Sequence, residues 1–394
     1  MSGVSGVSGV SGVSGVSGVS GVSGVSGVSG VALLGSPVSA EALIRSRDGT
    51  VGPYDPPDFV ATHLDIDKDK VLALWEPWVR ATVIDFELHS RLGLSVDSSA
   101  QSASVWHLQG KPGATSAPAF QRLVDVKRPS EAAFQEQLKL VYGYADLRGD
   151  RAAEIIGQLH GAGAFYSSIP YLHPDRTPKT FELVAAALRL AVFIQMRLKH
   201  ALACRRPHEL SPQIQPMVQT PGHAALPSGH ATEAFVTARV LWKLLRHVAA
   251  QASSPNSQYG DQAWGEHLMR LASRIAINRT VAGVHFPVDS AAGAVLGLTL
   301  GDYFVARCTT GATYSSWSFD GTKFPLPSGQ KAPPQDGDFY WHELYDAQND
   351  VQREAPTAPS SSSNLYATKT NAGLGVDQSP VLRWLWDKAA EEWQ

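Results

Sequence analysis

Apolar residues recur at helical spacing through most of this chain, and that periodicity predicts a mainly helical protein. The expected helices span residues 67–91, 130–144, 150–160, 181–206, 227–250, 264–277 and 287–305. Pro77 removes a backbone donor inside the first of them, which predicts a break or kink there. Runs that alternate apolar and polar residues are sparse, so few strands are expected. The pattern therefore predicts an all-α fold, a helical bundle.

The two ends of the chain depart from this pattern. Residues 2–31 are ten consecutive Ser-Gly-Val triplets, without the Lys or Arg that opens a secretory signal peptide. We interpret residues 1–35 as a flexible low-complexity tail, with a β-like assembly element as the alternative. From residue 310 onward the chain turns to Pro, Ser and Asp, which predicts an irregular C-terminal arm. Residues 36–394 are expected to form a single mostly helical domain.

Composition excludes several classes of protein. The 394 residues carry 33 Lys and Arg against 36 Asp and Glu, a net charge of −3, so no overall field favours nucleic acid. Two cysteines, Cys204 and Cys308, are too few for a disulfide framework. The most apolar helices, 181–199 and 287–307, contain charged residues and are expected to be core helices rather than membrane spans. We therefore expect a soluble protein; the sequence does not indicate its compartment.

The first candidate functional motif is a pair of cations. Lys199 and Arg206 are seven residues apart, two helical turns, so both are expected on one face of helix 181–206. The planar fork of Arg206 suits bidentate contact with a tetrahedral oxyanion, and Lys199 adds a compact charge. Pro207 then ends the helix. A lone pair of this kind is most often a solvated stripe, so it needs support from elsewhere in the chain.

The second motif is Pro227-Ser228-Gly229-His230, which opens the helix predicted to run to residue 250. The first N–H groups of a helix have no partner within it, and Ser228 adds a hydroxyl donor. Gly229 permits close approach of a ligand to the backbone. This helix start is therefore a natural seat for an anion.

The third motif supplies another guanidinium, Arg279, and then His285. Asp289 follows His285 by four residues. If Pro287 lies in the first turn of a helix, the Asp289 carboxylate can hold one ring nitrogen of His285. The other ring nitrogen would stay free as a nucleophile or a ligand.

In this order and spacing the three motifs resemble the superfamily shared by vanadium-dependent haloperoxidases and type 2 phosphatidic acid phosphatase-like acid phosphatases. The family pattern is Lys, six residues and Arg-Pro; then Pro-Ser-Gly-His; then Ser-Arg, five residues and His. The chain matches it throughout, except that Asn278 replaces the usual Ser before Arg279. This departure is expected to matter little, because the anion contact belongs to Arg279. The resemblance implies the helical bundle of this superfamily.

The resemblance also implies a role for each residue. Five residues would bind the oxygens of vanadate or phosphate, and we call them the oxyanion cage: Lys199, Arg206, Ser228, Gly229 and Arg279. His285 would be the metal ligand in a haloperoxidase, or the phosphate-accepting nucleophile in a phosphatase. His230 would be the acid–base group, and Asp289 would orient His285.

Two features favour the haloperoxidase. Residues 32–198, mostly helical in pattern, precede Lys199, as in soluble haloperoxidases and unlike the smaller acid phosphatases. His223 lies five residues before Ser228, where bromide-oxidising members of the family carry a second histidine and chloride-oxidising members a Phe. Met196 departs from the aromatic or Arg-lined pocket of better-known members. We expect a vanadate-dependent enzyme that oxidises bromide with hydrogen peroxide to hypohalous acid, which reacts with a small organic acceptor.

Three alternatives remain open. Phosphate can occupy the same site as vanadate, so a soluble acid phosphatase acting through a phosphohistidine uses the same residues. An oxyanion-binding protein without turnover would keep the cations but would not need His230. An assembly protein displaying the Ser-Gly-Val repeat is the third alternative. A homo-oligomer is compatible with each of them.

Overall fold

The computed structural model describes residues 37–55, 58–59, 62–110, 117, 119–159, 161–251, 253, 255–327, 336–357 and 364–394. The low-complexity tail expected at residues 1–35 lies outside the described residues. By internal packing the chain divides into two compact units, Met1–Val83 and Ile84–Gln394. Every candidate site residue falls in the second unit. The prediction of a single domain over residues 36–394 stays a prediction.

In the first unit the described elements are helices. They are α4 (Pro37–Thr50), the 3₁₀ helix η2 (Asp69–Leu74) and the first residues of α5 (Pro77–His89). Pro77 is the first residue of α5 and follows η2, so the predicted interruption at this proline is confirmed.

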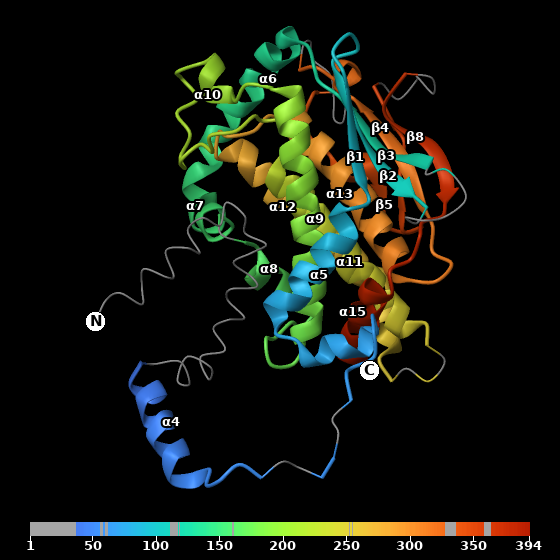
Figure 1. Ribbon diagram of the computed structural model, residues 1–394. Helices are drawn as coiled ribbons and strands as arrows, with labels where there is room; N and C mark the ends of the chain where they lie inside the picture. The colour runs from blue at the N-terminus through green and yellow to red at the C-terminus, as the bar shows by residue number, and fades with distance from the viewer. Residues whose placement is uncertain are drawn as a thin grey trace. The chain divides into compact units, whose positions relative to one another are not determined.

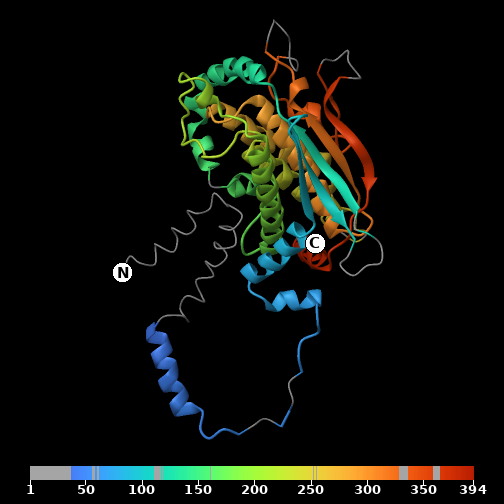
Figure 2. The same cartoon turned by 45° about the horizontal axis from the view of Figure 1, so that its top comes forward.

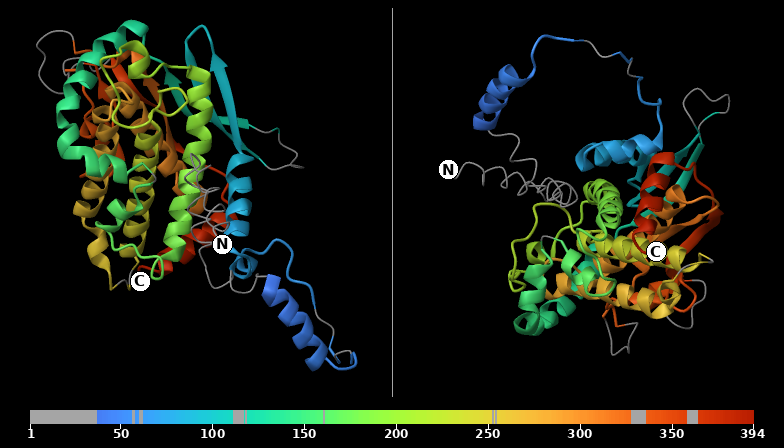
Figure 3. Two further views of the ribbon diagram at one scale, coloured as in Figure 1. Left: turned by 90° about the vertical axis from the view of Figure 1, so that its left-hand side faces the viewer. Right: turned by 90° about the horizontal axis from the view of Figure 1, so that it is seen from below.

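The second unit is built around long helices (Figure 1). The longest are α9 (Pro178–Leu202), α11 (Gly229–Ala249), α12 (Gln262–Val281) and α13 (Pro287–Cys308). Shorter helical elements complete the unit: α6 (Glu131–Gly143), η3 (Tyr144–Leu147), α7 (Arg148–Gly157), α8 (Gly163–Ser167), α10 (Pro207–Leu210), η4 (Ser257–Gly260), η5 (Gly321–Lys323), α14 (Trp341–Leu344) and α15 (Pro380–Glu391). α11 packs against α9, α12 and α13, as Figure 3 shows, and is the centre of the core.

A six-stranded sheet lies along one side of these helices (Figure 2). Its order is β1 (Leu92–Asp97), β2 (Ser102–Gln109), β3 (Ala119–Lys127), β4 (Tyr314–Asp320), β8 (Leu365–Leu374) and β7 (Ala355–Pro356). β3 and β4 pair in parallel, and the other neighbours are antiparallel. A further pair, β5 (Tyr345–Asp346) and β6 (Val351–Gln352), forms a second sheet. α13 packs on β3 and β4.

The expectation of an all-α bundle with an irregular C-terminal arm is therefore wrong. The arm contains β4, β8 and α15, and residues 92–127 form three strands. The period-two signal in these strands is weak, because β2 carries a register shift between Val105 and Trp106, and the outer half of β8 is exposed. The parallel pairing of β3 with β4 joins segments far apart in the chain, which no local pattern reveals.

Three glycines bring α13 unusually close to α11. Gly293, Gly297 and Gly301 recur every fourth residue on the face of α13 that meets α11. A Cβ atom at Gly297 would lie 2.5 Å from the carbonyl oxygen of Thr232, and one at Gly293 would lie 2.7 Å from that of Ser228. The contact therefore needs residues without side chains, and it fixes the start of α11 beside the start of α13.

None of the helices in the described ranges combines the length and the apolar character needed to cross a membrane.

We predict that Gly297→Ala destabilises the protein, because the new methyl group meets backbone atoms of α11 that cannot move independently. Overpacking of this kind costs about 1–3 kcal/mol, measurable as a lower urea midpoint. Gly143→Ala is the matched control, since a Cβ there meets nothing within 4 Å. Equal midpoints for the two variants would show that the helix contact is not tight.

Candidate active site

The candidate residues come from five places in the chain and meet at one end of the helical core. Lys199 lies on α9, and Arg206 immediately precedes α10. Ser228 caps the start of α11, and Arg279 lies near the end of α12. His285 lies between α12 and α13. Each of these five side chains is at most 3% exposed.

Lys199 and Arg206 do not share a helix face, contrary to the sequence prediction. α9 ends at Leu202, and Ala203 adopts a left-handed conformation with φ 49° and ψ 38°. Arg206 is extended, and its backbone N–H donates to Glu209 Oε2 at 2.7 Å. Cys204, expected on the helix, also lies beyond its end and is buried. Helices that end this way usually carry Gly at the left-handed position, so Ala203 gave no signal.

Backbone carbonyls orient the guanidinium of Arg206. Nε donates to His223 O at 2.8 Å, and Nη1 donates to Val284 O at 2.9 Å. The same Nη1 lies 3.4 Å from His285 Nε2, and Nη2 lies 3.1 Å from His223 Nδ1. Arg206 therefore contacts both histidines through one guanidinium, although it lies beyond the end of α9 and not on the helix that the sequence predicted.

Lys199 is held in a similar way. Its Nζ donates to the carbonyl oxygens of Ala224 and Ala225 at 3.0 and 2.8 Å. An ammonium group has three donors, so one is left for a ligand. Burial, followed by the nearby Arg206, lowers the pKa of Lys199. A bound oxyanion would oppose both effects and favour the charged form.

The start of α11 has the geometry expected of an anion seat. Ser228 is extended as the N-cap, and its Oγ accepts from the Ala231 N–H at 3.4 Å. The Ser228 N–H donates to Asp289 O at 2.9 Å, which ties this helix start to α13. Gly229 is closely covered, because a Cβ there would lie 3.2 Å from Gln195 Nε2.

The predicted pairing of His285 with Asp289 is confirmed. Asp289 Oδ2 lies 2.9 Å from His285 Nδ1 and accepts from the Phe286 N–H at 3.0 Å. With its hydrogen on Nδ1, His285 presents an unprotonated Nε2 toward Arg206. Burial, with Arg206 and Lys199 close by, lowers the pKa of His285 well below its ordinary value. The imidazole is therefore neutral near pH 7 and able to attack or ligate.

The guanidinium of Arg279 uses only some of its hydrogen-bond donors. Its Nη2 donates to Gln158 Oε1 at 2.9 Å and to Ile155 O at 3.3 Å. Nε and Nη1 are buried and have no hydrogen-bond partner among the described residues. Buried charged donors without an acceptor are costly, so they indicate a missing ligand of opposite charge. A tetrahedral oxyanion, phosphate or vanadate, fits this donor set.

The two remaining histidines differ in exposure. His230 is the second residue of α11, and its ring lies near the backbone of Gln158. Burial, followed by Arg279, lowers its pKa to about 3. His223 is exposed in the loop before α11, and desolvation, followed by Lys199, lowers its pKa to about 4. Both rings are thus neutral when no anion is bound.

The sequence reasoning missed the residues of α7 that support the site. Gln158 follows the last residue of α7, and Glu154 lies one turn earlier. Asn278 Nδ2 donates to both, at 3.0 Å to Glu154 Oε1 and 3.0 Å to Gln158 Oε1. Asn278 was expected to matter little, yet it holds the partner of Arg279. Two polar residues four apart on a predicted helix were the available signal, and such pairs are common on solvated faces.

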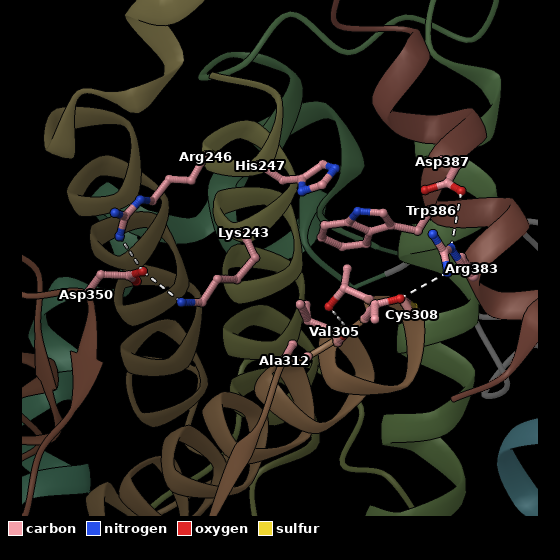
Figure 4. Close-up of a pocket in the computed structure, with 13 residues that line it drawn as sticks. Lys243, Arg246, His247, Val305, Cys308, Ala312, Asp350, Arg383, Trp386 and Asp387 are labelled. Carbon is pink, nitrogen blue, oxygen red and sulfur yellow. Dashed lines mark hydrogen bonds and ion pairs between the residues drawn. The ribbon is translucent and has the colours of Figure 1, made fainter. Parts of the chain in front are cut away.

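No group of three or more His, Cys, Asp or Glu side chains that could hold a metal ion occurs in the described part of the chain. A cavity of about 640 Å³ lies at the other end of α11, where Lys243 and Arg246 pair with Asp350 (Figure 4). It contains none of the candidate residues.

Comparisons with known proteins give one structural similarity and one family match. Among solved structures, the chain is similar to the first transmembrane PAP2 type phosphatidylglycerolphosphate phosphatase from Bacillus subtilis, at 15% identity and a TM-score of 0.27. That alignment covers 57% of this chain and 90% of that one. No curated protein sequence gives a significant match. Residues 182–313 match the sequence model of the PAP2 superfamily, and the matched residues include Lys199, Arg206, His230, Arg279 and His285.

Proposed function

We propose that this protein is a phosphatase that hydrolyses phosphate monoesters through a phosphohistidine at His285. The observation that carries the proposal is the free Nε2 of His285, 3.4 Å from Arg206 Nη1, in a site where Arg279 keeps two unpaired donors. A nucleophile and an oxyanion seat are thus built into one place. The PAP2 superfamily match covers both groups of residues.

In the first step Nε2 of His285 attacks phosphorus, the N–P bond forms, and the ester P–O bond breaks. His230 gives a proton to the departing oxygen. In the free protein His230 is neutral, but the negative charge of a bound phosphate opposes the cationic effect of Arg279 and raises its pKa. In the second step His230 takes a proton from water, which attacks phosphorus and releases phosphate and His285.

The three cations and Asp289 stabilise the charges that develop during the reaction. Lys199, Arg206 and Arg279 stabilise the phosphoryl oxygens as the transition state spreads charge over them. Asp289 keeps the hydrogen of His285 on Nδ1 and stabilises the positive ring that forms with the N–P bond. Burial raises the pKa of Asp289, and the backbone N–H of Phe286 counteracts this.

A vanadate-dependent haloperoxidase is the second candidate, and His223 is the observation that favours it. Its ring lies 3.1 Å from Arg206 Nη2, where it can meet a second substrate above the oxyanion. The oxyanion cage would hold the oxygens of vanadate and His285 its vanadium. Bound vanadate would supply activation of hydrogen peroxide toward halide. Hydrogen peroxide, bromide and a small organic acceptor would then be the partners.

One experiment separates these functions. Purified full-length protein is assayed for hydrolysis of p-nitrophenyl phosphate, and for bromide oxidation by hydrogen peroxide with and without added orthovanadate. We expect ester hydrolysis that vanadate inhibits, because both anions compete for the oxyanion cage. Bromide oxidation that requires vanadate, without ester hydrolysis, would select the haloperoxidase. Anion binding with neither activity would select the non-catalytic protein.

Lys199→Ala and Arg279→Ala should each weaken phosphate binding. Each removes one charge-assisted contact, worth about 1.5–3 kcal/mol, or roughly tenfold or more in the dissociation constant. Calorimetric titration with inorganic phosphate measures the effect. Lys139→Ala, on an exposed face of α6, is the control and should bind like wild type. Unchanged affinity in both cage variants would remove these residues from the site.

His285→Ala should abolish ester hydrolysis and leave phosphate binding largely intact. The substitution removes the atom that forms the N–P bond, whereas the three cations remain. Initial rates and a phosphate titration on the same preparation give both quantities. His208→Ala, an exposed histidine of α10, serves as the control. Retained turnover in His285→Ala would refute the phosphohistidine.

A further inference from the structure

Gln158 touches both the cationic and the acid–base side of the site. Its side-chain oxygen accepts from Arg279 Nη2 at 2.9 Å, and its backbone lies close enough to the ring of His230 to influence the pKa of that ring. Gln158 is 1% exposed, so water does not compete for these contacts. One residue at the end of α7 thus contacts two groups that the proposed mechanism uses.

Neighbouring residues fix which way the carboxamide of Gln158 points. Asn278 Nδ2 donates to Gln158 Oε1 at 3.0 Å, and Gln158 Nε2 donates to Glu154 Oε1 at 3.2 Å. Arg274 holds Glu154 through Nε and Nη2 at 2.7–2.9 Å. The guanidinium of Arg279 and the Nδ2 group of Asn278 are both hydrogen-bond donors. The carboxamide oxygen of Gln158, not its nitrogen, must therefore face them. The amide therefore has a single orientation.

We propose that Gln158 is a positioning residue that aims Arg279 and His230 at the bound oxyanion, and that its neutral amide leaves the whole charge of Arg279 for that anion. A carboxylate at this position would orient the guanidinium equally well but would neutralise it. The inference rests on the proposed function, because the oxyanion is taken to be the reacting phosphoryl group.

The surroundings of Arg279 agree with an uncompensated charge. Gln158 lies between Arg279 and Glu154, the carboxylate of this hydrogen-bond network, and Glu154 is paired with Arg274. Burial lowers the pKa of Arg279 to about 10, which Glu154 only partly opposes. The remaining two donors, Nε and Nη1, are the unpartnered ones. A bound anion would satisfy both their hydrogen-bonding capacity and the charge.

Gln158 also lies outside the PAP2 superfamily match, which starts at residue 182. The preceding part of the second unit therefore completes the site and does more than cover it. Because Gln158 lies outside the motifs, a substitution there can change the charge around Arg279 without changing any motif residue.

The test compares Gln158→Glu, which keeps the shape and the acceptor but adds a charge, with Gln158→Leu, which removes the acceptor. Gln352→Glu is the matched control: it too is a buried glutamine, donating to Val295 O on the far part of α13. Inorganic phosphate is titrated by calorimetry into each full-length protein, and melting temperatures are recorded. We expect a roughly tenfold or larger loss of phosphate affinity in both Gln158 variants and less than a twofold change in the control.

If Gln158 only supports the structure, Gln158→Glu should bind phosphate like wild type, because the hydrogen bond to Arg279 survives. That result would overturn the claim that a neutral side chain is needed beside Arg279. Wild-type affinity in Gln158→Leu would overturn the positioning role. If Gln158→Glu does not fold, Gln158→Leu still decides the positioning role, and Gln158→Met checks it with a side chain closer in length to glutamine: wild-type affinity in Gln158→Met overturns the proposal.

These outcomes are distinct from a failure of the proposed function. If wild type binds phosphate but hydrolyses no ester, the phosphatase proposal fails, and the affinities of the variants still decide the role of Gln158. If wild type binds neither phosphate nor vanadate, the oxyanion cage itself is absent and the role of Gln158 falls with it.

Discussion

Three buried cations that converge without enough negative charge around them are the constraint on which this structure depends. Lys199, Arg206 and Arg279 are each at most 2% exposed. Removing a charge from water is costly unless hydrogen bonds or an opposite charge replace the lost hydration. Backbone carbonyls supply part of that replacement. The rest is left for a ligand, so the free protein holds a site that is electrostatically incomplete.

Asp289 and Glu154 oppose part of this cost, and the fold fixes the helix ends that carry the charged groups. The starts of α11 and α13 are joined by the hydrogen bond from the Ser228 N–H to Asp289 O, and the same aspartate orients His285. α13 is in turn supported by the sheet through β3 and β4. Ser228 and His285 are therefore linked through Asp289, which suits the proposed reaction because positioning and charge govern it.

The sequence predicted the chemistry of the site better than its supports. Motif spacing named residues that the fold brings together, and the spacing of Pro287 and Asp289 predicted the partner of His285. The helical pattern also placed the start of α11 correctly. These features depend on local sequence, where capping and periodicity are readable.

The failures share a different cause. The left-handed residue that ends α9 is Ala203 rather than Gly, so the break before Arg206 could not be read locally. The sheet depends on pairing between β3 and β4, which are distant in the chain, and so an all-α fold was predicted instead. Gln158 and Asn278 act through contacts between α7 and α12, and their polarity alone resembles that of an ordinary surface.

The helices α13 and α11 lie close together because three residues of α13 at their contact are glycines, which have no side chain. At Gly293, Gly297 and Gly301, three successive turns of α13 lie within van der Waals contact of α11. A side chain at any of the three positions would push the two helices apart, and at Gly293 it would press on the backbone of Ser228. The separation between Ser228 and His285 therefore depends on three residues that carry no chemistry of their own.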